Sequence, residues 1–207
     1  MDRRSLIFGL GAISTGTAVG SYLALPSILK SNGQASGPTQ KANRSNEETV
    51  IRYFFWIGCN GCKEFTPKLK KWSRQNPSVS IIQSPVAPTR TWMPDALFAQ
   101  ALITNRVYDQ LYQHVYNARQ QGTLNTRSEL SIQNFLQVFQ LGHKYHDIML
   151  TLNSDDNKAL VDYHTYYFKS ADASSVPSIL LNDEELVATS NHQDTLNYLS
   201  LYSPDNT

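Results

Sequence analysis

Cysteine is scarce in this chain of 207 residues, with Cys59 and Cys62 as the only two. A zinc ion usually needs about four ligands, so the lack of a second cysteine pair argues against a structural zinc site. The chain also lacks a surplus of charge, because its formal net charge is +1 with both signs mixed along its length. This balance argues against a surface that binds nucleic acid. The length fits one domain of ordinary size, or one with an insertion.

The two cysteines stand in the motif Cys59-Asn60-Gly61-Cys62, which follows an apolar, aromatic run and opens a helical pattern. Unpaired N–H groups at the start of a helix favour an anion, so we expect Cys59 to hold a thiolate more readily than a free cysteine. A stabilised thiolate favours the reduced form and makes the disulfide a stronger oxidant. The motif therefore predicts a dithiol switch in which Cys59 is the nucleophile and Cys62 is the resolving thiol.

Other uses of the cysteine pair remain as alternatives. Two thiolates suit a soft Cu(I) ion, so a metal carrier is one of them. A purely structural disulfide is another, although so short a loop would constrain the unfolded chain little. His143, His146 and His164 suggest a further metal site, but helical histidines without a carboxylate or thiolate at matching spacing are usually surface residues. We expect no metal in this protein.

The first 30 residues differ in composition from the rest. Arg3 and Arg4 precede a long run of apolar and small residues, which is the pattern of an export segment. The order is similar to a twin-arginine signal, and a general secretory signal is the alternative. No clear cleavage site follows and the run is long enough to span a bilayer, so residues 1–30 are predicted to be a signal peptide or an N-terminal membrane anchor. Residues 31–48 are polar and aperiodic, which predicts a flexible linker.

Short β-branched and aromatic runs predict strands in the remaining chain, and apolar residues at helical spacing predict helices. On this basis we expect strand 49–57, helix 62–75, strand 79–82, helices throughout 95–172, strands 175–182 and 186–188, and helix 192–201. In the helical stretch, Gly122 and Gly142 are expected to end helices, and Ser128 and Ser154 to begin them. The order is that of an α/β, thioredoxin-like fold with an inserted all-helical domain. We assign 49–93 and 173–207 to the thioredoxin-like domain, and 94–172 to the insertion.

The chain resembles the DsbA family of bacterial periplasmic thiol:disulfide oxidoreductases over about Thr49 to Leu201. The motif Cys59-Asn60-Gly61-Cys62 stands where the family has its redox motif. Val176-Pro177 stands where the family has a valine followed by a cis-proline. The resemblance implies that the cis peptide faces the disulfide and leaves a backbone edge free to pair with a substrate chain. It therefore implies that the middle residues of the motif and the Val-Pro pair form the substrate-binding active-site loops.

Two positions depart from the pattern of this family. Typical members have a histidine before the second cysteine, where it adds a contact to the thiolate, whereas Gly61 offers only its backbone N–H. We therefore expect a weaker oxidant with a less depressed Cys59 pKa, and a pKa near about 3.5 would contradict this. The family also often buries a glutamate before the motif opposite a lysine on the next strand, and the matching positions are Tyr53 and Gln83. Without that proton acceptor, we expect resolution to depend on water or on Tyr53.

The function implied by the resemblance is the introduction of disulfide bonds into periplasmic proteins. The expected partners are unfolded or thiol-bearing exported proteins and a DsbB-like, quinone-linked membrane oxidase, and no dissociable cofactor is implied. We expect a periplasmic monomer, either soluble or tethered to the inner membrane by residues 1–30. Cys62, Lys63 and Pro67 are spaced as in thioredoxin, a reducing enzyme, so a thiol reductase or isomerase is an alternative. A non-enzymatic Cu(I)-binding or adaptor module is the other.

Aromatic residues near the motif are further candidates for substrate contact. Phe55 and Trp56 precede it directly and could form an apolar surface, with core packing as the alternative. The tyrosines of the helical stretch stand at helical spacing, so most of them are expected to lie in the core.

Overall fold

The computed structural model describes residues 49–187 and 189–203, so the predicted export segment (1–30) and linker (31–48) lie outside the described residues. In chain order the elements are β1 (Thr49–Phe55), α1 (Asn60–Gln75), β2 (Val79–Pro85), α2 (Met93–Thr104), α3 (Tyr108–Gln120), α4 (Glu129–Gln137), α5 (His143–Leu152), α6 (Asp155–Ser170), β3 (Ser178–Leu181), β4 (Glu185–Val187), α7 (His192–Leu199) and the 3-10 helix η1 (Ser200–Tyr202). Over the described ranges, no helix is both long enough and apolar enough to cross a membrane.

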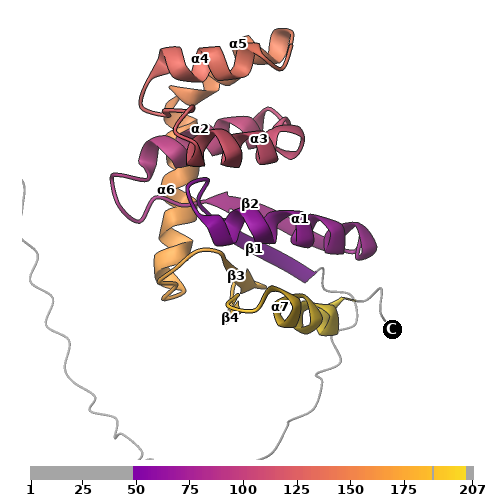
Figure 1. Cartoon of the computed structure of the whole chain (residues 1–207). Helices are drawn as coiled ribbons and strands as arrows, with labels where there is room; N and C mark the ends of the chain where they lie inside the picture. Colours follow the sequence, from indigo (N-terminus) through magenta and orange to yellow (C-terminus); the bar gives the residue numbers. More distant parts are fainter. Residues whose placement is uncertain (1–48, 188, 204–207) are drawn as a thin grey trace, which may run out of the picture. The chain divides into compact units, whose positions relative to one another are not determined.

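The sheet has the strand order β2-β1-β3-β4, with β1 and β2 parallel and the other pairs antiparallel. Successive side chains of a strand point to opposite faces, so the central strand β1 contributes to two cores. Ile51, Tyr53 and Phe55 belong to the core that includes residues of α1 and α7, and both helices run along this face (Figure 1). Phe54 points to the opposite face and makes an edge-to-face contact with Phe168 of α6. The site described below therefore stands on a strand that is buried on both sides.

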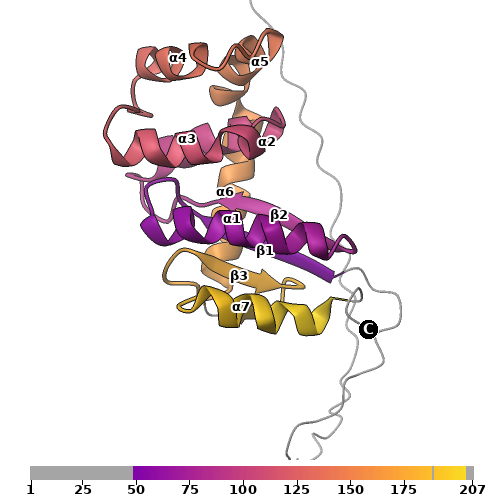
Figure 2. The ribbon, with the colours of Figure 1, turned by 45° about the vertical axis from the view of Figure 1, so that its right-hand side comes forward.

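The five helices α2 to α6 lie between β2 and β3 in the chain. Figures 1 and 2 show α4 and α5 furthest from the sheet, with α2 and α3 in the layer between them and α1. The long helix α6 runs past all of these layers and returns the chain to β3. This arrangement confirms the predicted thioredoxin-like fold with inserted helices.

Several predicted helix ends agree with the structure. Ser128 and Ser154 cap α4 and α6, because their hydroxyls accept hydrogen bonds from the backbone N–H groups of Ser131 and Asn157. Gly122 follows the end of α3 with a φ of 73°, a left-handed conformation that glycine adopts without steric cost.

Other predicted boundaries were wrong. The helix that begins at Ser128 ends at Gln137 and not at Gly142, since Gln140 has a left-handed φ of 50° that no helix accommodates. Gly142 instead precedes α5 as its N-cap residue. Strand β2 continues to Pro85, beyond the predicted end at residue 82, because its last three residues stay in register with β1. Strand β3 begins at Ser178 and not at 175, since the Val-Pro pair lies before it.

Candidate active site

The cysteine motif lies between the end of the buried strand β1 and the start of α1. Cys59 is the N-cap residue of α1, with the extended backbone conformation (φ −94°, ψ 123°) typical of that position. Its sulfur accepts a hydrogen bond of 3.3 Å from the backbone N–H of Cys62. The thiol thus takes the place that a serine or aspartate side chain takes at other helix starts. The position was predicted from the sequence.

The surroundings of Cys59 favour its thiolate. The hydrogen bond from the Cys62 thiol is the largest contribution, and with the backbone N–H groups of Cys62 and Gly61 it outweighs the opposing effect of burial, lowering the Cys59 pKa from 9.0 to about 6. At neutral pH most of the reduced protein therefore carries a thiolate at Cys59. This value agrees with the expectation of a less depressed pKa in the absence of the family histidine.

Cys62 has the opposite properties. Its side chain is completely buried, whereas Cys59 is half-buried. Burial raises the Cys62 pKa well above 9.0, and the neighbouring Cys59 raises it further, while a hydrogen bond from Tyr53 lowers it in part. One sulfur is therefore accessible and anionic, and the other is enclosed and protonated. This is the asymmetry expected of a nucleophile and a resolving thiol.

The Val176-Pro177 segment faces the motif, as predicted. The peptide bond between the two residues is cis. The Cys59 thiol lies 3.3 Å from the carbonyl oxygen of Val176, within hydrogen-bonding distance. A Cβ atom added at Gly61 would lie 3.1 Å from Cδ of Pro177, so the absence of a side chain permits this close approach. The structure thus brings together Cys59, Cys62, Gly61, Val176 and Pro177.

Asn60, the remaining predicted loop residue, is exposed on the first turn of α1. Its side chain is available at the rim of the site.

Beneath the motif, Tyr53 of β1 lies opposite Gln83 of β2 in the sheet. These are the two positions that were expected to match the glutamate and the lysine of the family. The Tyr53 hydroxyl lies 3.0 Å from the Thr66 hydroxyl and 3.4 Å from the Cys62 carbonyl oxygen. Gln83 does not reach Tyr53 with its side chain and donates instead to Asp109 at 2.9 Å. Hydroxyl groups therefore stand below the resolving cysteine.

A cluster around Asp95 was missed in the sequence. Asp95 of α2 is 1% exposed and accepts hydrogen bonds from the Trp56 indole N–H at 2.7 Å, from Arg119 at 2.8 Å and from the Thr126 hydroxyl at 2.5 Å. The Trp56 ring also stacks on Trp92, with centroids 4.3 Å apart. The hydrogen-bond partners of Asp95 come from separate segments of the chain, so no local sequence pattern could have indicated the cluster.

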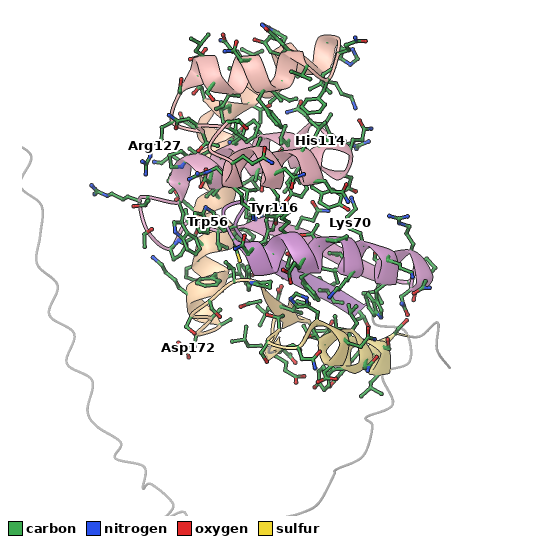
Figure 3. All side chains as sticks on the ribbon, in the orientation of Figure 1. Trp56, Lys70, His114, Tyr116, Arg127 and Asp172 are labelled. Carbon is green, nitrogen blue, oxygen red and sulfur yellow. The ribbon has the colours of Figure 1, made fainter. Side chains whose placement is uncertain are left out.

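This cluster holds Trp56 beside the start of α1 (Figure 3). A Cβ atom at Gly58 would lie 2.4 Å from the Trp56 ring, so the ring covers the glycine just before the motif. Trp56 is half-buried and remains a candidate for client contact, whereas Phe55 is completely buried and the expectation of a surface role for it was wrong. Phe55 faces inward because it alternates with Phe54 on a strand covered on both sides.

The three histidines considered as a possible metal site were expected to be surface residues, which is correct for two of them. His143 and His146 are exposed on α5, and His164 is buried in α6. Among the residues that the structure describes, no three histidine, cysteine, aspartate or glutamate side chains are grouped so as to hold a metal ion.

Comparisons with known proteins place the chain among thioredoxin-fold proteins. A family model described as Thioredoxin matches residues 43–199. No curated protein sequence matches significantly. The structure is similar to DsbA from Pseudomonas aeruginosa, with a TM-score of 0.68, 17% identity, and coverage of 76% of this chain and 83% of that one. It is also similar to the oxidoreductase DsbA from Xylella fastidiosa (TM-score 0.66, 18% identity, 75% and 84% covered). Reduced DsbA1 from Neisseria meningitidis gives a TM-score of 0.66 at 13% identity, with 80% and 87% covered.

Proposed function

Because this chain belongs to the thioredoxin family and has the fold of the DsbA proteins, we propose that it is a thiol:disulfide oxidoreductase that introduces disulfide bonds into exported proteins. The observation that supports this most directly is the position of the Cys59 sulfur. It caps α1 and lies 3.3 Å from the Val176 carbonyl oxygen. A nucleophilic sulfur is thereby placed beside a partly exposed backbone segment, along which an extended client chain can pair.

The reaction consists of two thiol exchanges. A client thiolate attacks Cys59 in the Cys59–Cys62 disulfide, the bond between the two cysteines breaks, and Cys62 receives the electron pair and then a proton. A second client thiolate attacks the client sulfur of the mixed disulfide and expels Cys59 as a thiolate. The client gains a disulfide and the motif gains two electrons. The lowered pKa of Cys59 makes it a good leaving group in the second exchange.

The pKa of Cys59 also supports a second candidate, a reductase or isomerase of the same fold. The reactive cysteine of the Cys-X-X-Cys motif has a pKa of about 3.5 in a strongly oxidising DsbA and of about 7 in thioredoxin. The value of about 6 lies nearer to the reducing enzyme. We therefore propose a moderate oxidant, whose direction in the cell depends on the partner that resets it.

The proposed setting is the periplasm, reached through the export segment predicted at residues 1–30. Oxidising compartments are where a protein disulfide persists. Clients would be unfolded or thiol-bearing exported proteins, and a quinone-linked membrane oxidase similar to DsbB would accept the two electrons. We propose that the protein acts as a monomer, which its sedimentation at working concentration would test.

The central experiment is oxidation of a reduced peptide with two cysteines by the disulfide form of the protein. We expect stoichiometric oxidation of the peptide, and loss of this activity in Cys59→Ser. The matched variant Cys62→Ser keeps the nucleophile but cannot hold the disulfide, so it should not oxidise the peptide. Mixed with oxidised glutathione, its Cys59 should attack the disulfide, release one glutathione and keep the other as a mixed disulfide that is detectable by mass.

Two further measurements separate the alternatives. A reductase would reduce insulin faster than it oxidises the peptide, whereas a Cu(I) carrier would do neither and would bind one Cu(I) per chain. Unchanged peptide oxidation by Cys59→Ser would overturn the proposed function.

A further inference from the structure

The proposed function requires Cys62 to gain and lose a proton, and the inference that follows rests on that function. When the disulfide opens, Cys62 receives an electron pair in a site that is completely closed to solvent. Burial and the neighbouring Cys59 both disfavour a thiolate there. A proton must therefore reach this sulfur in one direction of the reaction and leave it in the other. The structure contains a specific route.

The route begins with three hydroxyl groups, which we call the hydroxyl cluster: those of Tyr53, Thr66 and Tyr116. Thr66 donates to the Cys62 carbonyl oxygen at 2.8 Å, so its oxygen is left to accept from the two tyrosines. The Tyr53 and Tyr116 hydroxyls lie 3.0 Å and 3.4 Å from it. The one proton of the Tyr53 hydroxyl can point to Thr66 or to the Cys62 side chain, and in the second orientation it favours the thiolate and lowers the Cys62 pKa. Tyr53 thus lies 3.4 Å from the Cys62 carbonyl oxygen and also lines the cavity described next, which places its hydroxyl between Cys62 and that cavity.

A cavity of about 250 Å³ adjoins this cluster. Tyr53, Thr66 and Tyr108 line its inner part, and the lining also includes the exposed residue Asp109. The Tyr108 hydroxyl is buried and has no hydrogen-bond partner, so it offers a place for a water molecule. A polar cavity of this size has room for several waters. Figure 3 shows Tyr116 in the layer between α3 and α1, with Lys70 further along α1.

The charged and titratable groups around Cys62 leave few other proton carriers. The titratable groups that interact with Cys62 are Cys59 at the N-cap of α1, Tyr53 of β1, and Tyr108 and Tyr116 of α3. The cavity lining adds Lys70 and Arg74 of α1 and Asp109 of α3. Burial raises the pKa of all three tyrosines well above 10, so they remain neutral hydroxyls over the working range.

Asp109 is the one carboxylate among the residues that line the described cavity. It is exposed and engaged by Lys70 at 2.8 Å and by Gln83 at 2.9 Å, and these contacts outweigh burial and lower its pKa. A carboxylate held in this state is a poor proton acceptor. The hydroxyls and the water they can hold are therefore the groups placed to carry the proton.

We propose that Cys62 exchanges its proton with solvent through this cavity, and that the Tyr53 hydroxyl is the group that hands the proton to and from the sulfur. When the client opens the disulfide, the Tyr53 O–H proton passes to Cys62 as a cavity water reprotonates Tyr53. In the reverse direction the Cys62 thiol gives up its proton along the same path before its sulfur attacks Cys59. No charged residue has to enter the core.

The reaction of the reduced protein with oxidised glutathione tests this proposal. Cys59 attacks first and releases one glutathione, and Cys62 then loses its proton, attacks Cys59 and releases the second. Acid quenching and mass measurement count the adduct at each time and yield both rates. For Tyr53→Phe we expect an unchanged first step, a second step slowed roughly tenfold or more near neutral pH, and a pH profile of that step moved to higher pH.

Two further variants keep the test independent of folding. Ser73→Met fills the cavity from α1 without touching Cys62, and should slow the second step alone. Tyr166→Phe removes an exposed hydroxyl from α6 and should change neither step. Each variant is first shown to unfold in urea with the native slope.

The outcomes are distinct. If Tyr53→Phe or folded Ser73→Met resolves its adduct at the native rate and with the native pH profile, the proposed route is wrong while the proposed function stands. If the native protein forms no adduct at all, the proposed function fails and the route fails with it.

Discussion

Raising the pH should lower the reduction potential of the disulfide along two different slopes that meet near pH 6. Below the Cys59 pKa, opening the disulfide takes up two electrons and two protons, since both cysteines end as thiols. Above it, Cys59 remains a thiolate and only Cys62 takes up a proton. Because a tenfold change in equilibrium is worth about 30 mV for two electrons, the slope should change from about 59 mV to about 30 mV per pH unit.

The same pKa sets the size of the effect at neutral pH. When the pKa of a thiol falls from 9.0 to about 6, its reduced form is stabilised about tenfold at pH 7, which corresponds to about 1.4 kcal/mol, or about 30 mV for two electrons. Cys59 is partly exposed and solvent screens its charge, so these are upper values.

The sign of this contribution follows from linkage. The folded pKa is depressed, so the reduced protein has the full stabilisation above about pH 9 and loses it as the pH falls through about 6. The disulfide form has no thiol and lacks this dependence. As the pH rises from about 6 to about 9, the free energy of unfolding of the reduced form should therefore increase relative to that of the disulfide form.

The assay is equilibration with dithiol and glutathione buffers between about pH 5 and pH 9, with the reduced fraction counted by alkylation and mass. Cys62→Ser supplies an independent value, because its single thiol can be titrated by its reaction rate with an alkylating reagent. A constant slope through pH 6, or a change of slope only near pH 9, would refute the assignment of Cys59 as a stabilised N-cap thiolate.

Two ion pairs, each with one buried partner, yield further predictions. Asp95→Asn removes the charge that pairs with Arg119 and should lower the free energy of unfolding by about 2 kcal/mol, measured in urea, with a change in tryptophan fluorescence. Asp183→Asn leaves Arg52, whose side chain is 3% exposed, without its partner at 3.0 Å and should lower the free energy of unfolding by about 2 to 3 kcal/mol. Asp162→Asn neutralises an exposed carboxylate of α6 as the matched control, and an equal loss there would contradict both assignments.

Local signals in the sequence were sufficient to predict the motif and much of its setting. A thiol at a helix start and a serine at an N-cap each act within a few residues, so their structural consequences could be predicted without knowledge of the fold. The predicted place of Cys59 at a helix start and the predicted N-cap at Ser154 were confirmed for this reason. The cis peptide bond before Pro177 was also confirmed, but it was expected from the resemblance to the DsbA family. Boundaries that depend on one backbone conformation, such as the left-handed φ at Gln140, were not predictable, because glutamine carries no preference for it.

The polar contacts of the site could not be predicted, since they join distant segments. Asp95 follows a proline at the start of a helix and looks like an ordinary first-turn acid. Its burial depends on Trp56, Arg119 and Thr126, which lie 24 to 39 residues away in the chain. Periodicity correctly placed Tyr116 in the core but does not say what a hydroxyl meets there.

These contacts show what the inserted helices contribute to the thiol chemistry. Helix α2 supplies the carboxylate that fixes Trp56 over the glycine before the motif, and α3 supplies Tyr116 to the hydroxyl cluster below it. The two cysteines therefore differ in more than their exposure to solvent. The accessible Cys59 depends on the start of α1 for its charge, whereas the buried Cys62 depends on hydroxyls from β1, α1 and α3 for its proton. Substitutions in α3 should accordingly alter the resolution of mixed disulfides more than their formation, because attack by Cys59 uses none of those hydroxyls.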